Sequence, residues 1–219
     1  MKIYNSLTKN IEEIMPIEPG NVKMYCCGPT VYKDQQIGNW RTFSLADFLV
    51  RFLKMGGYKV DFIMNMTDVG HLFETSNDPE GGEDKIEKQS VEEGKSARDI
   101  VDMYSKMFLE EYKDLNLTEP RKFTKASEYI DSQIDLIATL EDKGFTYETT
   151  DGVYFDTSKF EKYGNLSGLT VENVKEGARV DPNPEKKNPT DFALWKFSPE
   201  GKKRQQEWQS PWGVGFPGW

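Results

Sequence analysis

The most constraining feature of this sequence is a strand–helix–strand pattern near its beginning. A short β-prone run, 22–27, stops at Gly28-Pro29, and a second β-prone run occupies 59–65. Between them, apolar residues recur with helical spacing until Gly56-Gly57 ends the helix. The apolar positions are Leu45, Phe48, Leu49, Phe52 and Leu53. This order predicts a parallel βαβ unit, and such units bind ligands at the carboxyl edge of their strands.

The rest of the chain mixes helical and β patterns. Ser96-x-x-Asp99 fits a capping box at the start of a helix. Another apolar helical pattern stops at Gly144, and Asp151-Gly152 lies between two β-prone runs, which predicts a hairpin. A further strand is expected at 192–195. We interpret residues 77–94, which are acidic and contain glycine, as a solvated loop.

The composition indicates a globular, acidic protein. Its 37% hydrophobic residues can form a core, and 28 basic against 37 acidic residues give a net charge of −9. That balance argues against a general nucleic-acid coat but allows a local docking surface. No segment approaches the roughly 18 apolar residues of a membrane span, no secretory signal is evident, and two adjacent cysteines make no disulfide framework. A cytoplasmic protein without membrane partners is expected.

The end of the chain is unusually aromatic. Trp208, Trp212, Phe216 and Trp219 crowd the last dozen residues, between prolines and glycines. Natural termini are usually polar and frayed, so we expect a chain that stops within a domain. The alternative is a short terminus capped by aromatic residues.

Five sequence blocks carry a family resemblance. They are 27–43 (with Cys27-Gly28-Pro29-Thr30 and Gln36-Ile37-Gly38-Asn39), 65–72, 177–180, 188–196 and 210–219. In this order they resemble cysteinyl-tRNA synthetase, a class I aminoacyl-tRNA synthetase, over essentially the whole chain. The resemblance implies an α/β fold, the first half of a Rossmann-type class I synthetase catalytic domain with an inserted α+β connective region.

The resemblance also implies a division into three parts. Residues 1–117 would be the first half of the nucleotide-binding catalytic domain, 118–215 the connective or acceptor-end insertion, and 216–219 the start of the second catalytic half. A Lys-Met-Ser-Lys-Ser loop is absent from the sequence. We therefore expect this chain, taken alone, to be inactive in ATP–pyrophosphate exchange.

Cys27 is the last residue of the first predicted strand, where a thiolate can bind zinc or a small side chain can simply pack. By resemblance it is one ligand of a Zn²⁺ that binds the substrate thiolate. Cys26 should face the opposite side of the strand and pack in the core.

Gln36-Ile37-Gly38-Asn39 takes the place of the family's His-Ile-Gly-His nucleotide motif. Without that resemblance it would be an ordinary loop before a helix. With it, Gln36 and Asn39 would donate hydrogen bonds to charge at the α-phosphate of ATP, and Gly38 would let the nucleotide approach the backbone. Gln36 departs from the family's first histidine and has no cationic form.

The remaining implied site residues contact substrates. Gly28 and Thr30 are expected at both ATP and cysteine, Thr67 at the substrate cysteine, and Trp219 as the aromatic wall of its pocket. Thr67-Asp68 also fits a helix-capping pair. His71, the one histidine of the sequence, is assigned no proton-transfer role.

The implied function is ligation of cysteine to tRNA(Cys) through cysteinyl-adenylate, with ATP and Mg²⁺, by a monomer. Two alternatives stay open: a ligase that joins cysteine to an amino sugar, and a non-catalytic remnant that binds nucleotide or a partner. Two basic runs, 186–187 and 202–204, would meet tRNA phosphates or form a solvated face.

Overall fold

The computed structural model describes residues 1–70, 72–73, 83–168, 183–199, 201 and 204–218, which form two compact units. Unit 1 contains Met1–Asp68 and Ile100–Glu128, and unit 2 contains Val69–Asp99 and Tyr129–Trp219. Trp219, His71 and the block 177–180 lie outside the described residues. Each unit has a sheet of its own.

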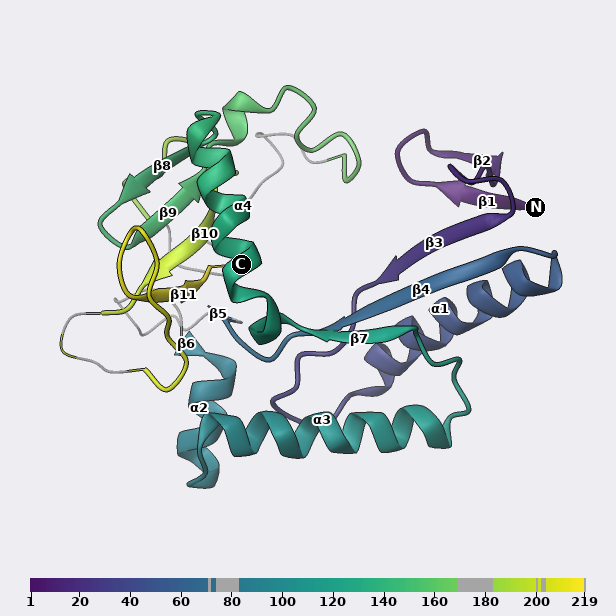
Figure 1. Ribbon diagram of the computed structural model, residues 1–219, viewed down its shortest axis with the longest axis horizontal. Coiled ribbons are helices and arrows are strands. Elements are labelled where there is room, and N and C mark those ends of the chain that lie inside the picture. The colour runs from purple at the N-terminus through teal and green to yellow at the C-terminus, as the bar shows by residue number, and fades with distance from the viewer. Residues whose placement is uncertain (71, 74–82, 169–182, 200, 202–203, 219) are drawn as a thin grey trace. The chain divides into compact units, whose positions relative to one another are not determined.

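Unit 1 is built on a parallel sheet with the strand order β3-β4-β7 (Figure 1). Cys26 lies opposite Met64 in the β3–β4 pair, and Met64 lies opposite Phe123 in the β4–β7 pair. Its elements are β1 (Lys2–Asn5), β2 (Asn10–Glu13), β3 (Asn21–Cys26), α1 (Ile37–Met55), β4 (Lys59–Met66), most of α3 (Ala97–Asp114), β7 (Lys122–Lys125) and the start of the 3-10 helix η1 (Ala126–Tyr129). The predicted βαβ unit and α/β fold are confirmed.

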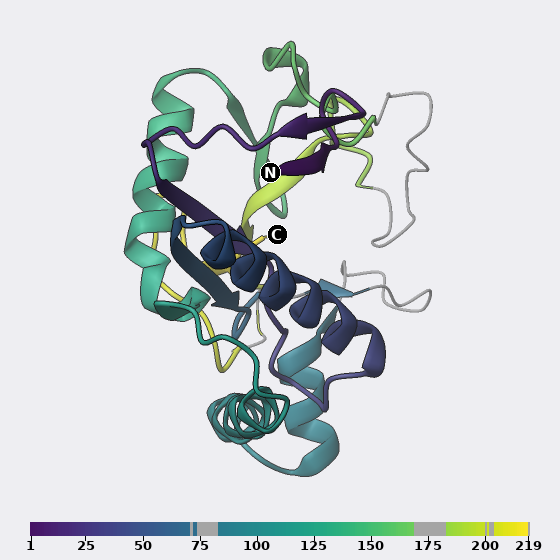
Figure 2. The same ribbon diagram turned by 90° about the vertical axis from the view of Figure 1, so that its right-hand side faces the viewer.

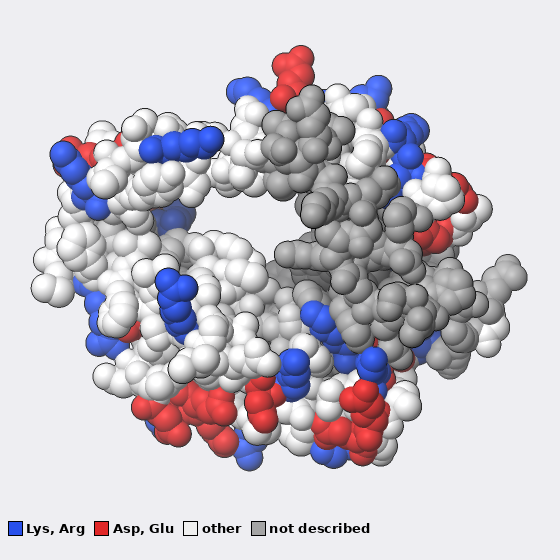
Figure 3. All heavy atoms as spheres, turned by 180° about the vertical axis from the view of Figure 1, so that it is seen from behind, with Lys and Arg blue, Asp and Glu red and all other residues white. Residues whose placement is uncertain are grey.

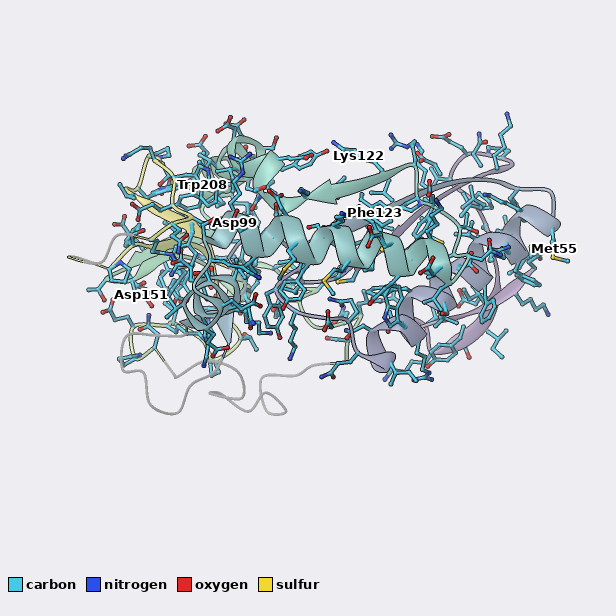
Figure 4. All side chains as sticks on the ribbon, turned by 90° about the horizontal axis from the view of Figure 1, so that it is seen from below. Met55, Asp99, Lys122, Phe123, Asp151 and Trp208 are labelled. Atoms are coloured by element: carbon cyan, nitrogen blue, oxygen red, sulfur yellow. The ribbon has the colours of Figure 1, made fainter. Side chains whose placement is uncertain are left out.

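An aromatic cluster fills the space between the sheet and two helices of unit 1. The ring of Trp40 on α1 stacks on Phe108 of α3 at 5.5 Å, and Phe123 of β7 meets Phe108 edge to face at 5.8 Å. Figure 4 shows Phe123 beside α3. Because α1, α3 and β7 share these rings, both helices cover the same face of the sheet, as right-handed crossovers require.

Helix α1 ends at Gly56-Gly57 as expected, but its buried stripe is not the most apolar one. Asp47 is only 4% exposed, whereas Leu45 and Phe48 are 68% and 67% exposed. The Asp47 carboxylate accepts hydrogen bonds from Arg51 Nε at 2.9 Å and from the backbone N–H of Thr118 at 2.8 Å. Figure 1 and Figure 2 show α1 running beside β4. Helical spacing therefore located the helix without identifying its buried side.

Unit 2 is built on an antiparallel sheet with the order β11-β10-β9-β8. The hairpin predicted around Asp151-Gly152 is confirmed, since Thr149 pairs with Gly152. Its elements are β5 (Leu72–Phe73), β6 (Glu83–Asp84), α2 (Lys85–Glu93), the first turn of α3, α4 (Ile130–Asp142), β8 (Thr146–Thr149), β9 (Gly152–Phe155), the 3-10 helix η2 (Thr157–Lys159), β10 (Phe192–Phe197) and β11 (Gly215–Pro217). The capping box of α3 is present, because the Asp99 N–H donates to Ser96 Oγ at 3.1 Å.

The interpretation of residues 77–94 as a solvated loop is wrong for 83–93. Asp84 is 1% exposed and caps α2 by accepting a hydrogen bond from the Ile86 N–H at 2.8 Å. Its other oxygen pairs with Arg204 at 2.7 Å. An acidic residue is buried here because both of its oxygens have partners.

The compact units divide the chain at other positions than the predicted domain ranges, which stay a prediction. Strand β7 lies after residue 117 but pairs with β4, so 118–128 belong to unit 1. Among the described residues no helix is long and apolar enough to cross a membrane. Acidic side chains gather along the lower edge of the view in Figure 3, in keeping with the net charge of −9.

Candidate functional site

The candidate site lies at the carboxyl edge of the parallel sheet in unit 1. The loop after β3 and the loop after β4 are joined there by two backbone hydrogen bonds. The Thr67 N–H donates to the Pro29 carbonyl at 2.8 Å, and the Val31 N–H donates to the Thr67 carbonyl at 3.1 Å. Thr30 and Thr67 consequently form a parallel bridge. Of the predicted residues, this edge brings together Gly28, Thr30 and Thr67, with Cys27 next to them in the chain.

Gly28 is required by the close approach of these two loops. A Cβ atom at this position would lie 1.8 Å from the backbone oxygen of Asn65 and 2.8 Å from Met64 Cγ. No side chain fits in that space, because the nearest atom is backbone and is held by the sheet. Glycine therefore allows the loop carrying Cys27 to lie directly against the end of β4.

Cys27 and Cys26 differ in environment, as strand alternation predicts. Cys27 is exposed, and Cys26 is partly buried. Burial raises the pKa of the Cys26 thiol, and the neighbouring Cys27 raises it further. Cys26 thus favours the neutral thiol, while the exposed Cys27 is the cysteine that a metal or ligand can reach.

The described residues do not by themselves make a metal centre. No group of three or more His, Cys, Asp or Glu side chains that would hold a metal ion occurs among them. A closed zinc site takes about four protein ligands, and Cys27 supplies one. The described residues therefore do not fit a complete zinc site.

Gln36 and Asn39 lie at the N-terminus of α1. Gln36 is the N-cap residue, and its backbone N–H donates to Asn39 Oδ1 at 3.1 Å. This contact orients the Asn39 amide and leaves its Nδ2 group exposed to solvent. Both side chains are exposed, beside the N–H groups of the first helical turn, where an anion is favoured.

No neighbour among the described residues requires a glycine at position 38, in the first turn of α1. Nothing lies within 4 Å of a Cβ atom built on it. The contrast with Gly28 is informative: one glycine is needed for packing, and the other leaves open space at a helix N-terminus.

The side chain of Asp68 fixes the loop that follows β4 by binding to Ser127. Its two carboxylate oxygens accept hydrogen bonds from the backbone N–H of Ser127 at 2.9 Å and from Ser127 Oγ at 2.5 Å. The side chain is 2% exposed. Asp68 therefore anchors the loop to the start of η1.

Sequence reasoning gave no role to Asn65, the residue that links the site together. Asn65 Oδ1 accepts hydrogen bonds from Tyr25 OH at 2.7 Å and from the Gly28 N–H at 2.9 Å. Its Nδ2 donates to Thr67 Oγ1 at 3.2 Å. The available signal was an amide side chain at the end of a buried parallel strand, two positions before a threonine.

The basic residues considered for tRNA phosphates are largely engaged within unit 2. Lys186 Nζ donates to the Pro189 carbonyl at 3.0 Å, and Lys187 Nζ lies 4.3 Å from the centre of the Tyr147 ring. Arg204 pairs with Asp84 and packs on Phe216 at 3.9 Å. Arg204 is therefore neither a solvated residue nor one available to RNA, and Lys202 and Lys203 lie outside the described residues.

A parallel sheet with crossover helices, and with loops that approach each other at its carboxyl edge, defines the class of open α/β proteins, in which ligands bind at that edge. A family model described as "tRNA synthetases class I (C) catalytic domain" matches residues 13–219. The chain belongs to this family.

Curated relatives match along the whole chain. A protein named cysteine–tRNA ligase 1 from Burkholderia lata is 46% identical over 219 residues, which cover 100% of this chain and 46% of the relative. Proteins named cysteine–tRNA ligase from Treponema denticola and Pyrococcus furiosus are 42% and 41% identical over the same 219 residues, which are 44% and 43% of their lengths. The chain thus spans somewhat under half the length of these relatives.

Proposed function

We propose that this chain carries the ATP and amino-acid part of a cysteine–tRNA ligase. The full reaction joins the cysteine carboxylate to the α-phosphate of ATP, releases pyrophosphate, and transfers the cysteinyl group to the 3′ end of tRNA(Cys). The proposal is supported by the names of the relatives. The amino-sugar ligase and the non-catalytic remnant have no comparable support.

The observation that carries the proposal is the joined pair of loops at the sheet edge. The Thr30–Thr67 bridge and the glycine-dependent contact of Gly28 with Asn65 create one surface from two strands. The substrate cysteine would lie against Gly28, Thr30 and Thr67. Trp219 is retained in the proposal as the aromatic wall of that pocket.

ATP would lie across the N-terminus of α1. Its α-phosphate would accept hydrogen bonds from the exposed amides of Gln36 and Asn39, and its base and ribose would pass over Gly38 and near Gly28 and Thr30. The first-turn N–H groups and these amides stabilise the negative charge that shifts as pyrophosphate leaves. Catalysis is then positioning and charge stabilisation, with the substrate carboxylate as the nucleophile.

Metal ions enter the proposal in two ways. Mg²⁺ would accompany ATP and neutralise its phosphates. Cys27 would supply one thiolate ligand to a Zn²⁺ that selects the substrate thiol over a hydroxyl, and the other ligands would come from outside the described residues. The zinc would act in substrate selection, and the bond changes at the carboxylate and the α-phosphate do not pass through it.

The other parts of the proposal concern the whole protein. Residues 1–117 and 216–219 would belong to the two halves of the catalytic domain, and 118–215 to the insertion near the acceptor end. We propose a monomer that acts in the cytoplasm on cysteine, ATP and tRNA(Cys).

Cysteine-dependent ATP–pyrophosphate exchange tests this function. The chain is joined to the C-terminal part of the Burkholderia lata relative, and exchange is measured with cysteine, serine and no amino acid. We expect exchange with cysteine alone, transfer to tRNA(Cys), and no exchange by the 219-residue chain. Exchange driven by another amino acid, or transfer to an amino sugar in place of tRNA, would contradict the proposal.

The role of Cys27 is tested in the same joined protein. Cys27→Ser should lower the zinc content and raise KM for cysteine at least about tenfold more than KM for ATP, because serine is a poorer zinc ligand. Cys26→Ser is the matched control, since it changes the neighbouring, partly buried thiol. Equal effects of Cys27→Ser on both substrates, with zinc retained, would return Cys27 to a packing role.

A further inference from the structure

Three hydrogen bonds of Asn65 fix the orientation of its side-chain amide. Oδ1 lies within hydrogen-bonding distance of two donors, Tyr25 OH at 2.7 Å and the Gly28 N–H at 2.9 Å. A flipped amide would place NH₂ against both donors and lose both bonds. Nδ2 must therefore face Thr67, and it donates to Thr67 Oγ1 at 3.2 Å.

This contact decides how the Thr67 hydroxyl can act. A hydroxyl has two acceptor lone pairs and one proton. The Asn65 amide occupies one lone pair, so the hydroxyl proton must point elsewhere. Among the described residues none accepts that proton, and Thr67 lies at the half-exposed sheet edge. The proton is thus available to a ligand.

A second hydrogen bond of Asn65 limits how Gly28 can act. Its N–H is already donated to Asn65 Oδ1. Gly28 therefore has no N–H to offer a ligand, and it serves the site through its small size and its carbonyl oxygen.

We propose that Asn65 is a positioning residue that holds the Thr67 hydroxyl as a hydrogen-bond donor to the bound amino-acid substrate. The acceptor of that bond is an oxygen of the substrate carboxylate, because the ammonium group has no lone pair and the proposed function assigns the sulfur to zinc. This inference rests on the proposed function, since it requires an amino acid at this edge of the sheet.

Asn65→Asp is the most direct variant. Aspartate keeps an acceptor for Tyr25 and Gly28 but replaces the Nδ2 donor with a second acceptor. The Thr67 proton then turns toward residue 65 and is lost to the substrate. We expect the affinity for L-cysteine of the protein joined to the C-terminal part of the Burkholderia lata relative, measured by equilibrium dialysis under reducing conditions, to fall about tenfold, the equivalent of one hydrogen bond. The affinity for ATP should change less than about twofold.

A double-mutant cycle separates this role from a charge or packing effect. Thr67→Val removes the hydroxyl in a side chain of the same shape and should also cost about tenfold in cysteine affinity. If Asn65 acts through Thr67, adding Asn65→Asp to Thr67→Val causes no further loss. A further tenfold loss in the double variant would overturn the proposal, because an added charge acts whether or not the hydroxyl is present.

Tyr25→Phe is the matched control. It removes one of the two donors to Asn65 Oδ1 and leaves the contacts to Gly28 and Thr67 in place. It should therefore weaken cysteine binding less than Asn65→Asp does. An equal loss would mean that packing around Asn65, and not the polarity of its Nδ2 group, controls binding.

Two outcomes distinguish this inference from the proposed function. If the protein joined to the C-terminal part of the Burkholderia lata relative, with Asn65 unchanged, binds neither ATP nor cysteine, the proposed function of this site fails and the inference fails with it. If that joined protein binds cysteine and its Asn65→Asp variant binds it equally well, only the inference fails. Should Asn65→Asp not fold, the side-chain amide signals of Asn65 in the joined protein give the answer. They must shift on addition of cysteine, and Thr67→Val must abolish that shift.

Discussion

A buried carboxylate of unit 2 and the polar side chains at the N-terminus of α1 in unit 1 have opposite surroundings. In unit 2, Asp191 is 3% exposed and accepts hydrogen bonds from Tyr147 OH at 2.8 Å, Thr157 Oγ1 at 2.7 Å and the Asn188 N–H at 2.9 Å. In unit 1, Gln36 and Asn39 are exposed at a helix N-terminus, where Asn39 has one backbone contact. The polar groups around Asp191 are used inside the fold, whereas those at the N-terminus of α1 are exposed, where the proposed function places a ligand.

The difference shows how a buried polar group can be classified. Burial alone would raise the pKa of Asp191, but hydrogen bonds from Thr157, Tyr147 and Asn188 outweigh it and lower the pKa. Such a carboxylate is ionised and fully bonded, which is typical of a structural role. The block 188–196, which contributed to the family resemblance, therefore has a structural role at Asp191.

The largest expected loss of stability comes from a substitution that breaks the polar network around Asp191 in unit 2. Asp191→Asn should destabilise the protein by about 4 kcal/mol, because an NH₂ group would face donors that are then left without acceptors. The matched control is Asp135→Asn on the exposed side of α4, which should change stability by less than about 0.5 kcal/mol. Urea denaturation measures both. Hydrogen exchange should locate the Asp191 loss in β8, β9 and β10, and a loss confined to unit 1 would contradict this comparison.

The next effect concerns packing in unit 1. Gly28→Ala should cost about 3 kcal/mol, because the new methyl group must displace the backbone of β4. Gly38→Ala is the control, since it adds the same methyl group in open space on a helix and should raise stability by up to about 1 kcal/mol.

The Gly38→Ala variant also separates an effect on ATP binding from an effect on stability. If Gly38 lies under the nucleotide, Gly38→Ala should weaken ATP binding of a protein that is at least as stable. Equal losses of stability in Gly28→Ala and Gly38→Ala would contradict the open space around Gly38.

Acid should weaken unit 2 through two hydrogen-bonded carboxylates, Asp151 and Asp191. Burial by itself would raise the pKa values of Asp151 and Asp191. Hydrogen bonds to both carboxylates outweigh burial, and at Asp151 the charge of Lys196 acts in the same direction as the hydrogen bonds. The two pKa values therefore lie below the ordinary value of about 4. Their contribution to stability is therefore complete above pH 4 or so and is lost as the pH falls through the lowered pKa values.

The measurement is the urea midpoint between pH 7 and pH 2.5. Asp191→Asn should show a smaller decrease over this range than the unchanged chain, because one of these carboxylates is gone. Asp84 works in the opposite direction, since burial raises its pKa and protonation favours the folded form. An identical acid dependence in the two proteins would mean that Asp191 is not ionised in the fold.

The smallest expected effect tests the exposed side chains of unit 1. In the protein joined to the C-terminal part of the Burkholderia lata relative, Gln36→His should raise kcat for adenylate formation by less than about tenfold, because a charged donor binds phosphate oxygens more strongly than an amide. Gln36→Met, which removes the donor, should lower kcat. Pyrophosphate exchange at saturating substrates measures both, and an unchanged or lower kcat for Gln36→His would show that glutamine is the adapted residue here.

Local sequence patterns determined part of the secondary structure and the sheet edge at which the candidate site lies. The βαβ unit, the Ser96–Asp99 capping box and the Asp151-Gly152 hairpin follow from residue spacing and turn chemistry, which act over a few positions. The carboxyl edge of the sheet was predicted as the ligand-binding edge because a βαβ unit joins parallel strands. The roles of Cys27, Gln36 and Asn39 came from resemblance and stay predictions.

The tertiary structure alone decided which polar groups are buried and which are free. Asp84 meets Arg204 across 120 positions, and Asn65 meets Tyr25 across 40 and Gly28 across 37. It also buried Asp47 on α1 and left Phe48 exposed. Spacing along one helix or strand determines which residues share a face. What that face meets depends on distant segments, and the burial and protonation of a carboxylate depend on those partners.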